Sequence, residues 1–186
     1  CRNLQFDDCV WGGMVNPKLA VALTGRSGEA LEDYKKLMLK LNNEVAAAAP
    51  EDLLINTHVC RGNYHSTFFS SGAYDSVADL LFGEENVNAY YLEYDDERSG
   101  GFAPLAKVSG DKKVVLGLVT TKTPVLENKE IVINRIHEAA KYVPLDRLYL
   151  SPQCGFASCE IGNKLTEEEQ WAKLKLVKEI AEEVWG

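Results

Sequence analysis

Residues 113–122 read KVVLGLVTTK, a nearly continuous apolar run that ends in three polar residues. Four other apolar segments end in polar side chains or are followed by them: residues 4–7, 53–60, 87–93 and 148–151. Strands of parallel sheets are buried on both faces, so they carry nearly continuous apolar runs rather than alternating ones. The five segments are therefore predicted to be parallel β-strands.

Helical patterns occupy most of the segments between these predicted strands. In residues 29–48, apolar side chains recur at three- and four-residue steps, and Pro50 ends the pattern. Further helices are predicted at residues 75–82, 104–108, 128–142 and 166–185, whereas glycines at positions 12, 13, 25 and 28 indicate a loop. The alternation of strands and helices predicts an α/β fold in which helices cover a parallel sheet.

Two architectures fit this alternation, a doubly wound open sheet and a (βα)8 barrel. No Gly-x-Gly-x-x-Gly pattern follows any predicted strand, so the dinucleotide-binding form of the doubly wound sheet lacks support. The chain has 186 residues, which is the size of one domain, and no linker interrupts the pattern. We therefore predict a single domain over residues 1–186.

Composition narrows the classes of function. Hydrophobic residues make up 46% of the chain and charged residues 26%, as in ordinary globular proteins. The formal net charge of −8 argues against nucleic acid or an anionic membrane as partner, because phosphate groups require a basic surface. The sequence predicts neither a membrane span nor a signal peptide, and five irregularly spaced cysteines then favour a reducing, cytoplasmic location.

Polar side chains gather where the predicted strands end. In chain order they are Asp7, Asp8, His58, Cys60, Glu93, Thr120, Thr121, Lys122 and Cys154. In parallel α/β proteins, and in barrels above all, the carboxyl ends of the strands carry the active site. The sequence thus predicts one functional site to which all five strand ends contribute.

Four of these residues form a candidate metal site. Residues i and i+2 of a strand point to the same side, so His58 and Cys60 can face one ion. Glu93 and Cys154 would join them from other strands, and one nitrogen, one oxygen and two sulfur donors suit Zn²⁺. The alternative is that the two cysteines are small buried hydrophobic residues and His58 a hydrogen-bonded core histidine.

Three runs at these strand ends resemble the catalytic domain of cobalamin-independent methionine synthase, and most closely its shorter single-barrel relatives. The runs are Asn56-Thr57-His58-Val59-Cys60, Tyr91-Leu92-Glu93 and Ser151-Pro152-Gln153-Cys154-Gly155. The family pattern has Thr-His-x-Cys, a strand that ends in Ile-Glu, and Asn-Pro-x-Cys-Gly. The opening run Leu4-Gln5-Phe6-Asp7-Asp8 resembles the family's strand that ends in Asp-Glu-Pro, so the likeness spans nearly the whole chain.

The resemblance implies a (βα)8 barrel with catalytic zinc held by His58, Cys60, Glu93 and Cys154. It implies methyl transfer to the thiol of homocysteine, which gives methionine, with a methylated folate or a methylated corrinoid as the donor. Asp7 matches the family's aspartate that binds the ammonium group of the substrate, and we expect Asp8 beside it to contribute. Because such a barrel has eight strands and about 250 residues, the chain would carry about the last five βα units.

One position departs from the family pattern. Members that use methyltetrahydrofolate carry a histidine in a His-Ser-Pro run, and this histidine protonates the folate leaving nitrogen. The matching run here is Lys122-Thr123-Pro124, so Lys122 is the predicted catalytic residue, together with Asp7. A lysine side chain ordinarily has a pKa of about 10.4. It suits that task only when desolvation lowers this pKa. The alternative is a surface Lys122 paired with Glu127. Because a lysine stands where the family has its histidine, a methylated corrinoid becomes an alternative to the folate as methyl donor.

Two further alternatives remain open at the level of sequence. The chain could be a related barrel enzyme that needs no metal, similar to uroporphyrinogen decarboxylase, or one that acts on another thiol or methyl donor. It could also retain the metal ligands of an incomplete barrel without a complete substrate pocket.

Overall fold

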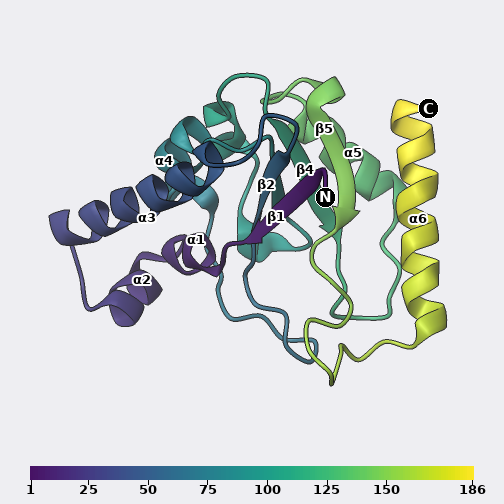
Figure 1. Cartoon of the computed structure of the whole chain (residues 1–186). Coiled ribbons are helices and arrows are strands. Elements are labelled where there is room, and N and C mark those ends of the chain that lie inside the picture. The colour runs from purple at the N-terminus through teal and green to yellow at the C-terminus, as the bar shows by residue number, and fades with distance from the viewer.

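The computed structural model describes residues 1–186, which form one parallel five-stranded sheet flanked by helices (Figure 1). The strands are β1 (Asn3–Asp7), β2 (Leu54–Val59), β3 (Ala89–Glu93), β4 (Lys113–Val119) and β5 (Leu148–Pro152). All four strand pairs are parallel. The predicted α/β fold is thereby confirmed, as is each of the five predicted strands.

The order of the strands separates the two architectures left open by the sequence. The sheet runs β1-β2-β3-β4-β5, so each strand pairs with its neighbour along the chain. A doubly wound sheet reverses direction at a switch point, whereas a barrel adds every strand on the same side. The sheet therefore has the topology of part of a (βα)8 barrel.

The long helices lie where the sequence pattern predicts them. They are α3 (Glu29–Ala47), α4 (Ala78–Glu84), α5 (Lys129–Ala139) and α6 (Glu167–Trp185). Thr166 and Glu169 form the capping box that opens α6. Single turns of 3₁₀ helix complete the connections at η1 (Tyr74–Ser76), η2 (Glu97–Ser99), η3 (Ala103–Lys107) and η4 (Leu145–Arg147).

The glycine-rich loop predicted after the first strand is wrong over most of its length. Two helices occupy it, α1 (Cys9–Met14) and α2 (Pro17–Thr24). Asp8 caps α1 by accepting hydrogen bonds from the N–H groups of Val10 and Trp11, and the side chain of Asn16 caps α2 in the same way. The caps and the packing of α1 outweigh the low helix propensity of its glycines.

The two faces of the sheet differ in chemistry. Alternate strand residues, among them Ile55, Leu92 and Leu116, belong to the apolar core that the sheet shares with the helices. In Figure 1, α3 and α4 flank the sheet on one side, and α6 lies beside β5 on the other. The opposite face mixes polar and apolar side chains and borders a hollow of about 580 Å³, whose lining includes Asn56, Lys113 and Tyr149. Function is therefore expected on this inner face.

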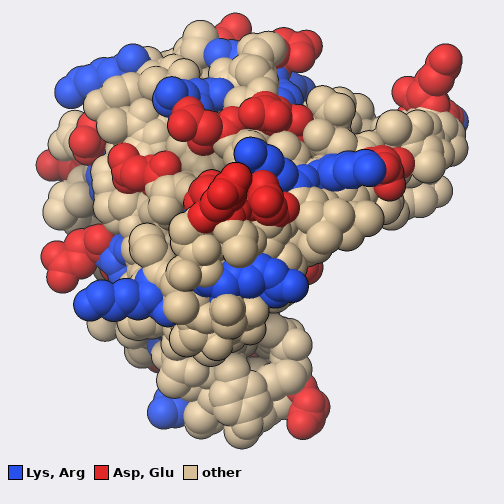
Figure 2. Space-filling view, turned by 90° about the vertical axis from the view of Figure 1, so that its left-hand side faces the viewer, with Lys and Arg blue, Asp and Glu red and all other residues tan.

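Charges on the surface are mixed in sign. Figure 2 shows Lys and Arg interspersed with Asp and Glu on the face that lies to the left in Figure 1. No helix of the structure is both long enough and apolar enough to cross a membrane.

A buried carboxyl group helps to hold α1, α3 and α4 together. Glu85, directly after α4, is fully buried, and the Asn42 amide donates to its Oε1 at 2.8 Å. The same amide nitrogen donates to Oδ2 of Asp8 at 2.7 Å, so Asn42 of α3 links the cap of α1 to the end of α4. Burial raises the pKa of Glu85 to about 7, which exceeds the opposing effect of the Asn42 hydrogen bond.

This raised pKa predicts a pH-dependent stability. A carboxyl group whose pKa is higher in the folded than in the unfolded state favours folding when protonated, so that stabilisation is lost as the pH rises. Between about pH 4.5 and 7 the free energy of unfolding should fall by up to about 3 kcal/mol on account of Glu85. Glu85→Gln should remove this slope in urea unfolding measured across that range. Glu84→Gln, at the exposed neighbouring position, is the matched control and should retain it; equal slopes in both variants would contradict the assignment.

Candidate metal centre

The carboxyl end of β2 directs two donors to the inner face. His58 and Cys60 lie two residues apart, and Val59 between them is fully buried in the apolar core on the other side. His58 pairs with Asp7 of β1 and with Tyr91 of β3 in the parallel register. The alternation along a strand thus sends both donors to one side, as the sequence predicts.

Glu93 is the last residue of β3 and its carboxylate is fully buried. Oε1 accepts a hydrogen bond of 2.8 Å from the backbone N–H of Arg61 and lies 3.8 Å from Nε2 of His58. Oε2 accepts a hydrogen bond of 3.0 Å from Arg98. Burial raises the pKa of Glu93, although Arg61, Lys122 and His58 oppose the shift.

Cys154 reaches the same place because the chain bends after β5. The register between β4 and β5 is irregular between Gly117 and Val119. A side chain at Gly117 would come within 2.6 Å of the Cα of Gln153 and 2.7 Å of the carbonyl oxygen of Leu92. The missing side chain therefore lets the segment that carries Cys154 cross the end of β4.

Hydrogen bonds hold this segment in place. The side-chain carbonyl of Gln153 accepts from both the N–H and the hydroxyl of Thr121, at 2.6 and 2.9 Å. The Asn63 amide donates to the carbonyl of Gly155 at 2.6 Å, and Asn163 donates to Asn63 at 2.9 Å. The loops after β2, β4 and β5 are thereby joined around Cys154.

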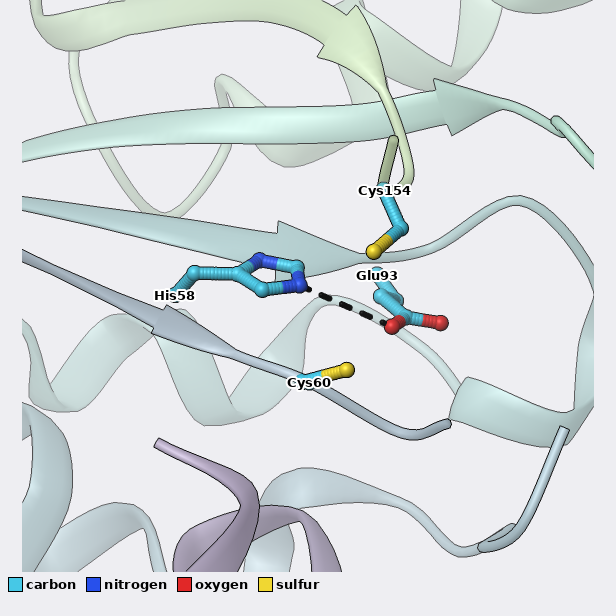
Figure 3. Close-up of side chains that lie close together, drawn as sticks. All are labelled: His58, Cys60, Glu93 and Cys154. Atoms are coloured by element: carbon cyan, nitrogen blue, oxygen red, sulfur yellow. Dashed lines mark ion pairs between the residues drawn. The ribbon is translucent and has the colours of Figure 1, made fainter. Parts of the chain in front are cut away.

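The four predicted ligands converge, as Figure 3 shows. The donor atoms of His58, Cys60, Glu93 and Cys154 all lie within 4.8 Å of one another. Donors around a tetrahedral Zn²⁺ lie roughly 3.3–3.8 Å apart, so only small side-chain movements are needed to enclose an ion. The cluster borders a pocket of about 440 Å³ that opens on the inner face of the sheet.

The state of His58 fits a metal ligand. Its Nδ1 lies 3.1 Å from the carbonyl oxygen of Tyr91, and a carbonyl can only accept, so Nδ1 carries the proton. Nε2 is buried, faces Glu93 and has no hydrogen-bond partner. A histidine fixed by a backbone carbonyl through one nitrogen, with the other nitrogen free, has the arrangement that metal sites use.

The two thiols behave as a pair. A hydrogen bond from Cys60 lowers the pKa of Cys154 to about 4, and nearby His58 lowers it further against the effect of burial. The same hydrogen bond, together with burial, raises the pKa of Cys60. The lowered pKa favours the thiolate form of Cys154, and a thiolate is the form that binds metals.

The other predicted site residues lie around this cluster. Oδ1 of Asp7 is 3.8 Å from Nε2 of His58, and the Asp7 side chain is 65% exposed, so it can meet a ligand from solvent. Asp8 points elsewhere: its oxygens cap α1 and accept from Asn42, and its role in substrate binding stays a prediction.

Lys122 is buried, and its Nζ lies 3.9 Å from Oε2 of Glu93 with no hydrogen-bond partner. The alternative ion pair between Lys122 and Glu127 is wrong, because the fully buried Lys173 occupies Glu127 at 3.0 Å. Lys122 therefore stands beside the cluster of candidate ligands rather than on the surface.

Sequence patterns missed two neighbours of the cluster. Arg98 lies in the charged run after β3, which is typical of a solvated loop, yet its side chain is only 6% exposed. The thiol of Cys9 lies within 4.8 Å of donor atoms of Asp7 and Cys60, which the predicted loop gave no reason to expect. Arg98 lies five residues after Glu93. This spacing matches neither strand nor helix periodicity, so the sequence pattern did not indicate a contact between Arg98 and Glu93.

Comparisons with known proteins identify the family and the fold of the chain. Residues 33–183 match the family model of the cobalamin-independent synthase catalytic domain. The uncharacterised protein YxjG of Bacillus subtilis is 49% identical over 186 residues, which cover all of this chain and 49% of YxjG. The chain thus spans about half the length of the curated relative that it matches.

Two solved structures share the fold. One, from Listeria monocytogenes, bears the provisional name vitamin-B12-independent methionine synthase and is 40% identical, with a TM-score of 0.75 over 100% of this chain and 49% of its own. The other is a B12-independent methionine synthase from Shewanella in complex with selenomethionine. It is 20% identical, with a TM-score of 0.72 over 98% of this chain and 48% of its own.

Removal of one thiol tests the cluster. Cys154→Ser should weaken Zn²⁺ binding by more than about 100-fold, because the thiolate donor disappears. Loss of a residue that only supports a ligand weakens metal binding less, by about 10- to 100-fold. Cys159→Ser changes a thiol five residues further on and is the matched control, which should bind as the parent chain does. Competition with a chromophoric chelator measures both. Unchanged zinc affinity in Cys154→Ser would exclude this ligand set.

The backbone of Gly12 packs closely against the backbone of Cys60. A side chain at Gly12 would lie 1.9 Å from the carbonyl oxygen of Cys60, whereas one at Gly13 would meet only the end of the Leu23 side chain at 2.9 Å. Gly12→Ala should therefore destabilise the protein by about 1–3 kcal/mol, although alanine favours helices, and should weaken metal binding. Gly13→Ala should be neutral or stabilising. Chemical unfolding and chelator competition report the two effects, and equal stabilities of the two variants would contradict the prediction.

Proposed function

The chain belongs to the family of the cobalamin-independent synthase catalytic domain, and from this membership we propose that it holds the zinc centre of a homocysteine methyltransferase. The reaction moves a methyl group to the thiol of homocysteine and forms methionine. The observation that carries the proposal is the convergence of His58, Cys60, Glu93 and Cys154, with the buried Nε2 of His58 left unpartnered.

Zinc suits both the donors and the reaction. When bound, Zn²⁺ lowers the pKa of a coordinated thiol and fixes its sulfur in place, so that a nucleophile is available near neutral pH. Two cysteine thiolates from the chain keep such a centre rich in electrons, and His58 completes a donor set of nitrogen and sulfur. Glu93 supplies the remaining oxygen, which we propose gives way to the sulfur of the substrate.

Asp7 is the proposed partner of the substrate's ammonium group. Its carboxylate is exposed at the end of β1 and stands 3.8 Å from Nε2 of His58, so the site presents an anion beside the place for the sulfur. A charge-assisted hydrogen bond to the ammonium group would orient the amino acid with its thiol toward the cluster. Burial raises the pKa of Asp7, while nearby His58 opposes that effect.

Lys122 is the proposed acid beside the cluster. The ammonium group lies 3.9 Å from Oε2 of Glu93, makes no hydrogen bond, and belongs to a side chain that is only 7% exposed. A buried cation that makes no hydrogen bond can donate a proton or a hydrogen bond to a leaving group that develops negative charge. It can equally serve a donor that needs no proton, so both a methylated folate and a methylated corrinoid are candidate donors.

We propose that the chain is the C-terminal part of one barrel domain. β1 and β5 each have one neighbouring strand, and their free edges expose backbone groups that a closed barrel would pair. Leu54 and Tyr149, both lining the inner hollow, are 50% and 41% exposed. Three further βα units would cover these residues. The proposed thiolate ligands require reduced cysteines, so we place the protein in the cytoplasm.

The decisive experiment measures zinc and product together. Protein purified without chelator should contain close to one zinc ion per chain and should form methionine from homocysteine. Methyltetrahydrofolate and methylcobalamin are offered separately, to the chain alone and with the part of YxjG that the chain does not match. Absence of zinc from the purified protein would refute the proposal.

The identity of residue 122 should decide the donor. With methyltetrahydrofolate, Lys122→Met should lower the rate by at least about 100-fold if the lysine acts as the acid, and Lys122→His should restore it. With methylcobalamin, both variants should retain the parent rate. Equal rates of the parent chain and both variants with the folate would show that Lys122 takes no part in catalysis.

A further inference from the structure

We propose that Arg98 is a positioning residue that holds the outer oxygen of Glu93 and thereby weakens this carboxylate as a metal ligand. The substrate can then displace it as a thiolate, with the thiol proton released to solvent. The inference rests on the function proposed above and adds to it a residue that sets how readily the fourth ligand exchanges.

The two oxygens of Glu93 have different surroundings. Oε1 faces the cluster, 3.8 Å from Nε2 of His58, as the dashed line in Figure 3 marks. Oε2 points away from both thiols in the same view and accepts a hydrogen bond of 3.0 Å from Nη2 of Arg98. Arg98 therefore engages one oxygen, and the other, which accepts a hydrogen bond from the N–H of Arg61, keeps a second lone pair for an ion.

The position of Arg98 is built by several contacts. Asp95 accepts from Nη2 at 2.8 Å and from Nη1 at 3.5 Å, and Asp96 also accepts from Nη1. Asp96 further caps the turn by accepting from the Arg98 N–H at 2.9 Å. The Phe68 ring lies below the guanidinium group at 4.8 Å, and Gly72 donates to the Arg98 carbonyl. The guanidinium group is thus fixed before any ligand arrives.

The consequence follows from charge sharing. A carboxylate that is hydrogen-bonded to a guanidinium group offers less negative charge to a cation on its other oxygen, and it cannot turn to bind through both oxygens. Because Glu93 is buried, the interaction is only weakly screened by solvent. Glu93 is then a one-oxygen ligand of moderate strength, which a thiolate can replace.

Arg98 is better placed for this task than the other cation at Oε2. Lys122 stands 3.9 Å from this oxygen, beyond hydrogen-bond distance, whereas Arg98 donates at 3.0 Å. When the substrate sulfur displaces Glu93, Arg98 also keeps the released carboxylate paired. A buried carboxylate without such a partner would be costly.

The test measures ligand exchange on the purified 186-residue chain. The chain is loaded with Co²⁺, and homocysteine is titrated while the thiolate–cobalt absorption is recorded. Arg98→Met should raise the homocysteine dissociation constant by about tenfold, as expected when one charge-assisted hydrogen bond is lost. The metal dissociation constant from chelator competition should stay the same or fall, because Glu93 becomes the stronger ligand.

Three further variants separate positioning from a merely structural effect. Arg98→Lys should recover part of the homocysteine affinity through one donor to Oε2. Glu97→Gln, at the exposed position next to Arg98, should bind homocysteine as the parent chain does. In a Glu93→Gln background, Arg98→Met should have no further effect on homocysteine binding.

The outcomes are distinct. An unchanged homocysteine affinity in Arg98→Met would overturn the inference while leaving the proposed function intact. Weaker binding of both metal and homocysteine would also overturn it, because Arg98 would then only maintain the structure. A parent chain that binds neither Co²⁺ nor homocysteine would overturn the proposed function, and this inference with it.

Discussion

The in-register parallel pairing of neighbouring strands is the constraint on which the site depends. Asp7 pairs with His58, and His58 pairs with Tyr91, two residues before Glu93. Parallel strands end at the same edge of a sheet, so this register brings an imidazole and two carboxylates together from segments far apart in sequence. A slip of one residue in β2 would turn His58 and Cys60 into the apolar core.

The second constraint is electrostatic. Two carboxylates and two thiols lie close together around the cluster, and Glu93 among them is fully buried. Unpaired buried charges are costly, and two cations from different loops, Arg98 and Lys122, lie near Oε2 of Glu93. The backbone N–H of Arg61 donates to Oε1. Both cations therefore compensate Glu93 from the side that faces away from His58.

Much of this arrangement could be predicted from sequence because it follows local periodicity. Apolar runs gave the strands, and the two-residue repeat of a strand placed His58 beside Cys60. The Pro-x-Cys-Gly run identified Cys154, although its approach depends on a bend after β5 and on the space that Gly117 of β4 leaves for it, which no periodicity indicates. Glu93 followed from its place at the end of a strand.

The failures have a common cause, which is that a residue's role depended on a distant contact. Gly12 suggested a loop, but its missing side chain makes room for the carbonyl of Cys60, 48 positions away in the numbering. Arg98 lies in a charged run that suggests exposure, yet its partners Glu93 and Asp95 bury it. Glu127, the expected partner of Lys122, instead pairs with Lys173, which lies in α6. The composition of a local segment does not indicate contacts with residues that are distant in the sequence.

The distribution of unpaired polar atoms connects stability with the proposed chemistry. Buried side-chain atoms without hydrogen-bond partners include Nε2 of His58, Nζ of Lys122 and Nε2 of Gln153, all at the carboxyl end of the sheet. Each such group costs about 1–3 kcal/mol of stability. Under the proposed function, a metal ion would satisfy His58 and a bound substrate would satisfy Lys122. At these two atoms the ligands would supply the contacts that the free protein lacks, so ligand binding would stabilise this end of the sheet.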